Sequence, residues 1–227
     1  MSDPFFSVII PAHNAEKHIR KALDSIESQK FRDFELIVVC DSCEDGTEQI
    51  AREYTEHVLT VKYHRDGLTR DAGIRVATGQ WLMFMDDDDW WLHEYVLSML
   101  AERVGKHGED IFVFGFINSG LGYITQHMDV INSDSFANVW AKCFRREIIG
   151  TAHFGNHIYC SDRYFLKGVL QNAWKIVFWD MPLYYYNWNR PGSQTDAMIN
   201  GQSHGWYFPY KIYQDGKEDR MNEQETY

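Results

Sequence analysis

Four consecutive carboxylates, Asp86 to Asp89, are the residues of this sequence best suited to chemistry. They follow a short apolar run, Trp81 to Met85, which predicts a buried strand. Unpaired buried charges are costly, so the four acids should sit at an accessible edge. Carboxylate oxygens at the carboxyl end of a strand favour a Mg2+ or Mn2+ ion that also binds phosphates. A solvated acidic turn that caps the next helix is the alternative interpretation.

Strands and helices alternate in the part of the chain that must position these acids. Apolar runs predict strands, and apolar residues three and four positions apart predict helix faces. The alternation predicts an α/β fold with a mainly parallel central sheet and helices on both faces. The loops after Ile10, Val39 and Met85 should then converge on one crevice that suits a nucleotide. Expected strands are 6–10, 34–39, 57–63 and 81–85.

The second half has fewer signals. A strand is expected at 111–117, a helix over 140–149, a helix after Ser161 and Asp162, and a strand at 174–181. Asn14 is the expected N-cap of the first helix, because its side-chain oxygen can accept a hydrogen bond from a free backbone N–H of the first turn. No dinucleotide-binding or P-loop signature is present in the sequence.

Composition limits the function classes. The 227 residues suffice for one large domain, and aromatic residues make up 15%, which suits sites for bases or sugars. The net charge of −11 argues against a nucleic-acid-binding surface, which needs a basic footprint. A single nucleotide diphosphate is still compatible, because a metal ion and a few local cations can neutralise it.

The chain carries neither a signal peptide pattern nor an apolar run of about 18 residues that would span a membrane. A reducing, cytoplasmic location is the resulting expectation. Cys40 and Cys43 form a C-x-x-C pair, but a loop follows them where a redox motif would have a helix. Structural zinc is also disfavoured, because the sequence has no second close cysteine pair.

Four segments follow one another in a specific order and spacing: Ser7–Asn14, Val38–Thr47, Leu68–Gly73 and Ala77–Trp90. Taken together, they resemble the family-2 glycosyltransferases. Most of the chain, about residues 5–195, takes part in the resemblance, which implies a single GT-A (Rossmann-like) domain. We expect a domain over 1–196, with a nucleotide-binding half (1–91) and an acceptor-binding half (92–196), and an aromatic then polar extension over 197–227. In this sequence Cys40, Ser42 and Cys43 replace the usual Asp, Gly and Ser, and Asp71 replaces Asn.

The resemblance implies roles on the donor side. Asp41 and Arg70 would hold the base of the nucleotide, and Asp86 would face its ribose. Asp88, with Asp86, would bind Mn2+ or Mg2+. Arg190 would contact the diphosphate, although a surface position is the alternative. Nucleotide-sugar binding is expected from these and from Pro11, Ala12, His13, Asn14 and Asp87.

On the acceptor side, Ser161-Asp162 resembles the family's Glu-Asp pair, which makes Asp162 the general base. A sugar hydroxyl needs a carboxylate to take its proton before it can attack. A helix N-cap is the alternative for this pair. Trp140 matches a position beside the acceptor sugar, with a core tryptophan as the alternative. His153 and His157 could add a metal ligand but are more simply structural.

The expected function is an inverting, metal-assisted transfer of a hexosyl or N-acetylhexosaminyl group from a UDP-sugar, as in polysaccharide biosynthesis. The acceptor could be a glycan, a lipid-linked glycan or a protein. The aromatic segment 206–213 could dock on the domain, form a homodimer or mediate peripheral membrane association. A nucleotidyltransferase and a non-catalytic nucleotide-sugar-binding module are the alternative functions.

Overall fold

The computed structural model describes residues 3–124, 138–157, 160–188 and 190. They belong to one compact unit, Met1–Arg190. The extension predicted over 197–227, with its aromatic segment, lies outside the described residues.

A nine-stranded sheet forms the centre of the described unit, in the order β3-β2-β1-β4-β8-β6-β9-β5, with β7 beside β6. Neighbouring strands among β3, β2, β1 and β4 are parallel. In the second half β6 and β9 are parallel, whereas β8 runs antiparallel to β4 and β6. The predicted α/β class is confirmed, and the antiparallel pairs are those that involve β5, β7 and β8. The strands are β1 (Phe6–Ala12), β2 (Phe34–Asp41), β3 (Val58–Val61), β4 (Trp81–Phe84), β5 (Trp90–Trp91), β6 (Ile111–Asn118), β7 (Gly122–Ile124), β8 (Lys142–Arg145) and β9 (Ile176–Tyr186).

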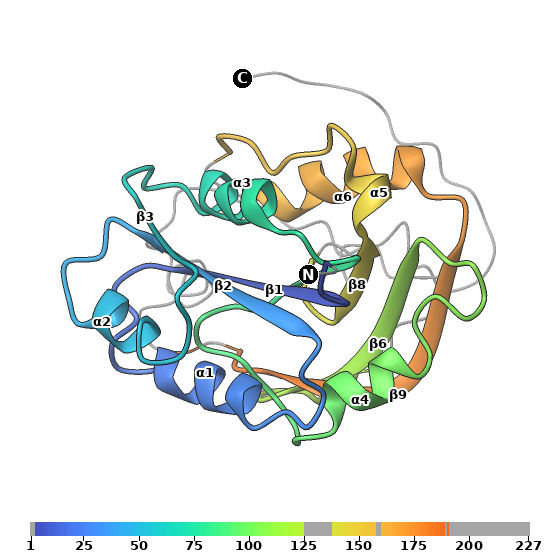
Figure 1. Cartoon of the computed structure of the whole chain (residues 1–227), viewed down its shortest axis with the longest axis horizontal. Helices are drawn as coiled ribbons and strands as arrows, with labels where there is room; N and C mark the ends of the chain where they lie inside the picture. Colours follow the sequence, from blue (N-terminus) through green and yellow to red (C-terminus); the bar gives the residue numbers. More distant parts are fainter. Residues whose placement is uncertain (1–2, 125–137, 158–159, 189, 191–227) are drawn as a thin grey trace. The chain divides into compact units, whose positions relative to one another are not determined.

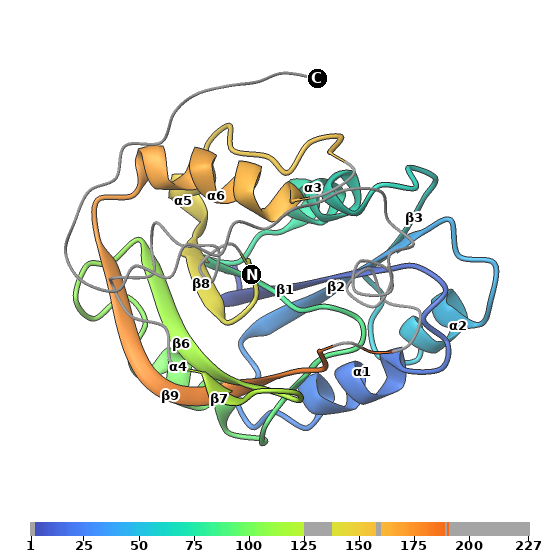
Figure 2. The ribbon, with the colours of Figure 1, turned by 180° about the vertical axis from the view of Figure 1, so that it is seen from behind.

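Helices cover both faces of the sheet (Figures 1 and 2). Helices α1, α2 and α4 lie on one face, and α3, α5 and α6 lie on the other. The longest described helix has 12 residues, and none in the described ranges has the apolar length that a bilayer crossing requires. The helices are α1 (Ile19–Glu27), α2 (Thr47–Ala51), α3 (Asp66–Val76), α4 (Val96–Ala101), α5 (Arg146–Ile149) and α6 (Ser161–Asn172).

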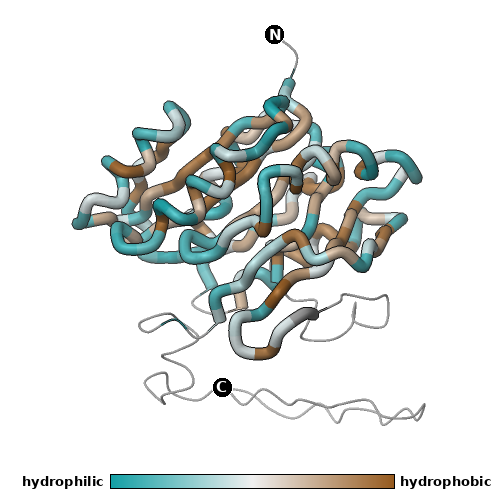
Figure 3. Tube along the Cα trace, turned by 90° about the horizontal axis from the view of Figure 1, so that it is seen from below, coloured by the Kyte–Doolittle hydropathy of each residue, from teal (hydrophilic) through white to brown (hydrophobic). Residues whose placement is uncertain are grey.

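The core has two layers, one on each face of the sheet. Successive side chains of β4 alternate between them, as the pleat of a strand requires. Trp81 and Met83 pack with α1 and α4, whereas Leu82 and Phe84 pack with α6. In Figure 3 the apolar colour follows the strands, and the polar colour marks the connecting loops. The acidic residues after β4 are therefore held at the end of a strand that is buried on both faces.

Two local predictions were wrong. The segment predicted as a helix over 140–149 begins with strand β8, and only Arg146–Ile149 is helical. Pairing with β4 and β6 on both sides outweighs the local preference. Asn14 does not cap α1, because that helix begins at Ile19 with His18 at the cap position. Asn14 instead has a φ of 49° and accepts the Glu44 N–H at 2.8 Å.

Phe84 links this core to the acidic segment and provides a test of the fold. Its ring contacts Phe154 and Phe165 edge-on at centroid distances of 5.3 and 5.5 Å. Phe84→Ala should lower the free energy of unfolding by about 3–5 kcal/mol, because the cavity cannot be refilled. Tyr95→Ala, at a side chain that is 51% exposed, should change it by less than about 1 kcal/mol. Chemical denaturation measures both, and equal effects would contradict the described core.

Candidate functional site

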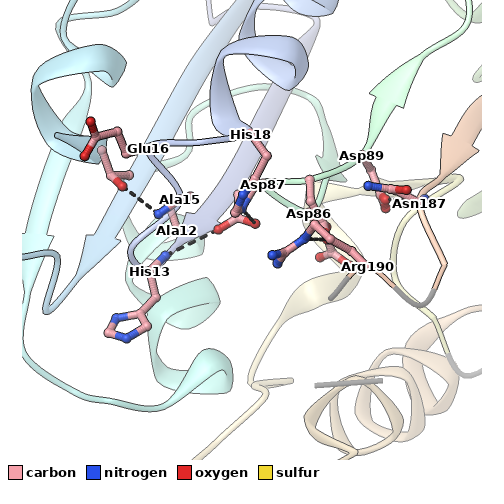
Figure 4. Close-up of polar contacts among 12 residues, drawn as sticks. Ala12, His13, Ala15, Glu16, His18, Asp86, Asp87, Asp89, Asn187 and Arg190 are labelled. Atoms are coloured by element: carbon pink, nitrogen blue, oxygen red, sulfur yellow. Dashed lines mark hydrogen bonds and ion pairs between the residues drawn. The ribbon is translucent and has the colours of Figure 1, made fainter. Parts of the chain in front are cut away.

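The carboxyl ends of β1, β2 and β4 meet at one edge of the sheet, as expected for parallel strands. Figure 4 shows Asp86 and Asp87 at the end of β4, next to His13 and His18 from the loop after β1. Asp87 joins these segments, because its carboxylate accepts the His13 N–H at 3.4 Å and contacts His18 Nε2 at 3.1 Å. The structure thus brings the loop after β1 and the acidic run together. The Asp87 carboxylate is engaged with His13 and His18, so it holds the loop in place.

Arg70 connects three carboxylates from three separate elements. Its guanidinium, in a residue that is 5% exposed, bonds to Asp66 one turn earlier on α3. Nη2 also donates to Asp86 Oδ1 at 2.6 Å, and Nη1 lies 4.0 Å from Asp162 Oδ1 at the start of α6. The predicted donor-side residues Arg70 and Asp86 therefore lie next to Asp162, the predicted general base. Sequence reasoning missed Asp66, although its i,i+4 spacing from Arg70 on a helix was an available signal.

Negative charge exceeds positive charge around this arginine. The side chains of Asp86 and Asp162 keep 29% and 24% of their surface exposed, yet the surrounding protein still penalises their charges. Burial raises the pKa of Asp86 to about 7, although Arg70 opposes the shift. Burial likewise raises the pKa of Asp162 to about 6, again against Arg70. Such a cluster favours a further cation.

Asp88 and Asp89 point to different partners. Asp88 Oδ2 accepts from Arg190 Nε at 2.6 Å, so these two predicted site residues lie together. Asp89 is fully buried, and it accepts the Tyr184 hydroxyl at 2.5 Å and the Asn187 N–H at 2.8 Å. Asp89 therefore fixes the acidic turn to the end of β9, whereas Asp88 is the carboxylate that a bound cation could share.

The acid-rich edge fits a divalent ion by its donor chemistry. Asp86 and Asp88 offer hard oxygen donors. Burial and the neighbouring acids disfavour the negative charge of Asp86. No three His, Cys, Asp or Glu side chains converge to hold a metal within the described ranges. One or two carboxylates completed by substrate phosphates is the usual arrangement for Mg2+. His153 contacts the Thr151 carbonyl and His157 stacks on Tyr164, which supports the structural interpretation of both histidines.

Residues predicted for the base pocket meet at the ends of β1 and β2. His13 Nδ1 lies 2.6 Å from the Asp41 carbonyl, and Asn14 holds the backbone of Glu44. Pro11 and Ala12, at the end of β1, are buried beside them. The Asp41 carboxylate accepts from the hydroxyls of Ser42 and Thr69 and from the N–H groups of residues 63, 64 and 65. Both carboxylate oxygens of Asp41 therefore already accept hydrogen bonds from the protein. Its predicted contact with the base of a nucleotide stays a prediction.

Asp162 lies in the first turn of α6, but it is not the cap. Cys160 occupies the cap position without a side-chain capping bond, so the capping interpretation of Ser161 or Asp162 is wrong. Asp162 Oδ2 instead accepts the Val139 N–H at 3.3 Å. Ser161 donates its hydroxyl to Asp66 Oδ2 at 3.2 Å, which ties the helix start to the Arg70 cluster.

Trp140 packs in the core. It is 7% exposed and stacks on Tyr184 and Tyr186, with ring centroids 5.1 and 4.6 Å away. The core alternative accounts for these contacts, and the acceptor role of Trp140 stays a prediction that its burial does not support. Asp71, which replaces the usual Asn, accepts the N–H groups of Phe154 and Gly155 and so holds the loop before α6.

Known proteins share both the sequence pattern and this fold. A family model described as glycosyl transferase family 2 matches residues 7–170. Glycosyltransferase GlyA of Streptococcus pneumoniae is 26% identical and matches 81% of this chain but 30% of that protein. The uncharacterised glycosyltransferase EpsJ of Bacillus subtilis is 27% identical, over 85% of this chain and 63% of that protein. The chain therefore spans less than two thirds of these relatives.

Solved structures give the same picture. Residues 1–349 of S. aureus TarS, in complex with UDP-GlcNAc, superimpose with a TM-score of 0.74 at 25% identity, over 87% of this chain and 61% of that one. The Pyrobaculum calidifontis mannosyltransferase PcManGT, in complex with GDP-Man and Mn2+, has a TM-score of 0.67. At 16% identity, over 89% of this chain and 62% of that one, this second likeness supports the fold alone.

Asp41 gives a pH-dependent test of the pocket. Burial alone would raise the pKa of Asp41, but bonds from His64, Thr69, Arg65 and Tyr63 lower it to about 2 from an ordinary value of 3.8. Its charged form should contribute about 2 kcal/mol of stability above pH 4, which is lost as the pH falls through about 2.

The free energy of unfolding of Asp41→Asn should therefore lie well below that of the wild type at pH 7, with the gap narrowing between pH 4 and pH 2. Chemical denaturation across this range measures it. Glu44→Gln, an exposed neighbour, is the control and should show no such trend. A gap for Asp41→Asn that stays constant with pH would contradict the described bonds.

Proposed function

The chain belongs to glycosyl transferase family 2, and from this premise we propose that it transfers a sugar from a UDP-linked donor to an acceptor hydroxyl with inversion. The observation that carries the proposal is the Arg70 cluster. It holds Asp86, on the donor side, and Asp162, the candidate base, on one guanidinium. A displacement needs these two groups within one small site.

The donor would occupy the edge formed by β1, β2 and β4. Pro11 to Asn14 and Asp41 would line the base pocket, with Asp41 holding the 63–65 backbone in place. Asp86 bonds to Arg70 through Oδ1, which leaves Oδ2 for the ribose. Asp87 would fix the pocket loop against the acidic run. The TarS structures in complex with UDP and with UDP-GlcNAc support a uridine diphosphate donor.

Asp88, with Asp86 beside it, would hold Mn2+ or Mg2+. When bound, such an ion stabilises the negative charge that develops on the leaving diphosphate. Arg190 neutralises Asp88 in the present structure. Release of Asp88 to a cation would leave the Arg190 guanidinium available for the diphosphate, which it can bind through two parallel hydrogen bonds.

Asp162 would take the acceptor proton. Its pKa of about 6 leaves it ionised at neutral pH while it remains a stronger base than an ordinary carboxylate. The acceptor oxygen would attack the anomeric carbon opposite the departing diphosphate, and its proton would move to Asp162. Inversion follows, because a single displacement occurs.

The sugar and the acceptor are proposed only as classes. A hexosyl or N-acetylhexosaminyl donor is expected, and UDP-GlcNAc is the first candidate because TarS binds it. A glycan, a lipid-linked glycan and a protein are the acceptor classes to be compared. Roles in polysaccharide biosynthesis and a cytoplasmic location stay predictions.

The test is UDP release from a panel of UDP-hexoses and UDP-N-acetylhexosamines, with Mn2+ and mixed acceptors. Wild-type protein should release UDP, with a rate that falls about tenfold per pH unit below pH 6 as Asp162 is protonated. Asp162→Asn should lose at least about 100-fold in rate and still bind UDP. Full activity of Asp162→Asn would rule out Asp162 as the general base. Release of pyrophosphate would indicate a nucleotidyltransferase, and binding without release a non-catalytic module.

The metal role has its own test, which needs no turnover. With UDP present, Asp88→Asn should bind Mn2+ more weakly by at least about tenfold, because a charged ligand is lost. Asp89→Asn is the matched control, because Asp89 faces Tyr184 and Asn187. Electron paramagnetic resonance of free Mn2+ measures both affinities. Equal affinities in Asp88→Asn and wild type would remove Asp88 from the metal site.

A further inference from the structure

Lys142 is a fully buried cation that the proposed mechanism does not use. It is the first residue of β8 and has no exposed surface. Its Nζ donates to the Asn138 carbonyl at 2.8 Å and to Asn138 Oδ1 at 2.5 Å. Burial lowers the pKa of Lys142 to about 7, and the nearby Asp162 opposes that shift. Burying such a group is costly, so its placement calls for a role.

The lysine closes a tight turn, because its partner Asn138 lies four residues earlier. Within that turn Ala141 has a φ of 56°, a left-handed conformation that non-glycine residues rarely adopt. Val139, also inside the turn, donates its N–H to Asp162 Oδ2 at 3.3 Å. The bonds from Lys142 therefore hold a strained backbone in the conformation that directs an amide at the candidate base.

We propose that Lys142 is a positioning residue for Asp162: its ammonium ties Asn138 into the turn whose Val139 amide orients the carboxylate. This inference rests on the proposed function of Asp162. The turn anchors Oδ2 on the β8 side, and Arg70 lies 4.0 Å from Oδ1 on the α3 side. Oδ1 therefore faces the donor residues, where the acceptor hydroxyl would have to lose its proton.

The charges around Asp162 predict the direction of the effect. Lys142 is the cation that acts on Asp162 from β8, and its positive charge favours the ionised carboxylate. Removing that charge and loosening the Val139 contact both favour the protonated form, so the pKa of Asp162 should rise. Among the described residues, the other charged or titratable groups that act on Asp162 are Asp66 and Arg70 on α3, Asp86 after β4, and Cys160.

The experiment titrates Asp162 directly by 13C NMR of protein labelled at the aspartate carboxyl carbons. The Asp162 signal is identified by its absence in Asp162→Asn. In Lys142→Met, which keeps the length of the side chain without its charge, the midpoint should rise by about one pH unit. Lys175→Met is the matched control, because Lys175 is exposed and its Nζ bonds to the His107 carbonyl. The control midpoint should equal that of the wild type.

An unchanged Asp162 midpoint in Lys142→Met would overturn the inference. Should this variant fail to fold, Asn138→Ala removes one acceptor of the ammonium while the lysine remains. Its midpoint should move upward by a smaller amount, and no movement would overturn the inference equally. A second readout is kinetic: kcat for UDP release should fall in Lys142→Met while the affinity for UDP stays the same. The Asp162 titration midpoint can be measured without any turnover. If the wild-type protein releases no UDP, that result contradicts the proposed function, but the effect of Lys142 on Asp162 can still be tested.

Discussion

The pairing of Arg70 with three carboxylates is the interaction on which the site depends. Asp66, Asp86 and Asp162 come from α3, the segment after β4 and α6, so one guanidinium fixes three elements together. Buried ionic groups seldom add net stability, because desolvation offsets most of the attraction. We therefore attribute the cluster to positioning. Without Arg70 the acids would repel one another, and the proposed donor-binding residues would no longer be held next to Asp162, the proposed general base.

The charge balance of the cluster explains the rest of the site. One guanidinium cannot neutralise three acids, and Asp88 adds a fourth nearby charge that Arg190 balances. Lys142 supplies positive charge to Asp162 from the opposite side. The protein thus surrounds an acid-rich edge with cations on separate elements, an arrangement that would suit the charged donor and the metal ion that we propose.

Much of this arrangement could be predicted from the sequence. The strand before Asp86, the parallel first half of the sheet and the meeting of three loops all follow from local pattern, because strands buried on both faces read as continuous apolar runs. The partners could not be predicted in the same way. Asp66 and Ser161 are 95 residues apart, and only the packing of α3 beside α6 joins them.

The errors have the same origin. Strand β8 has only two apolar residues, Cys143 and Phe144, between the basic residues Lys142 and Arg145. The local pattern therefore favoured a helix, whereas pairing with two strands makes the segment a strand. The Thr69 hydroxyl and the backbone donors that bond to Asp41, and the tyrosines that cover Trp140, also come from distant segments, and the roles of Asp41 and Trp140 stay predictions. Residue type therefore indicated which side chains lie at the site, whereas tertiary contacts decide which of them remain available to a ligand.

A crystal structure with UDP and Mn2+ tests most directly whether this edge is a metal-assisted donor site. We predict the ion within about 2.5 Å of an Asp88 oxygen, the uracil against Pro11 to Asn14, and Arg190 moved from Asp88 toward the phosphates. The Asp162 carboxylate should face the β-phosphate side of the site. A diphosphate bound elsewhere, or an ion with no contact to Asp86 or Asp88, would contradict this assignment.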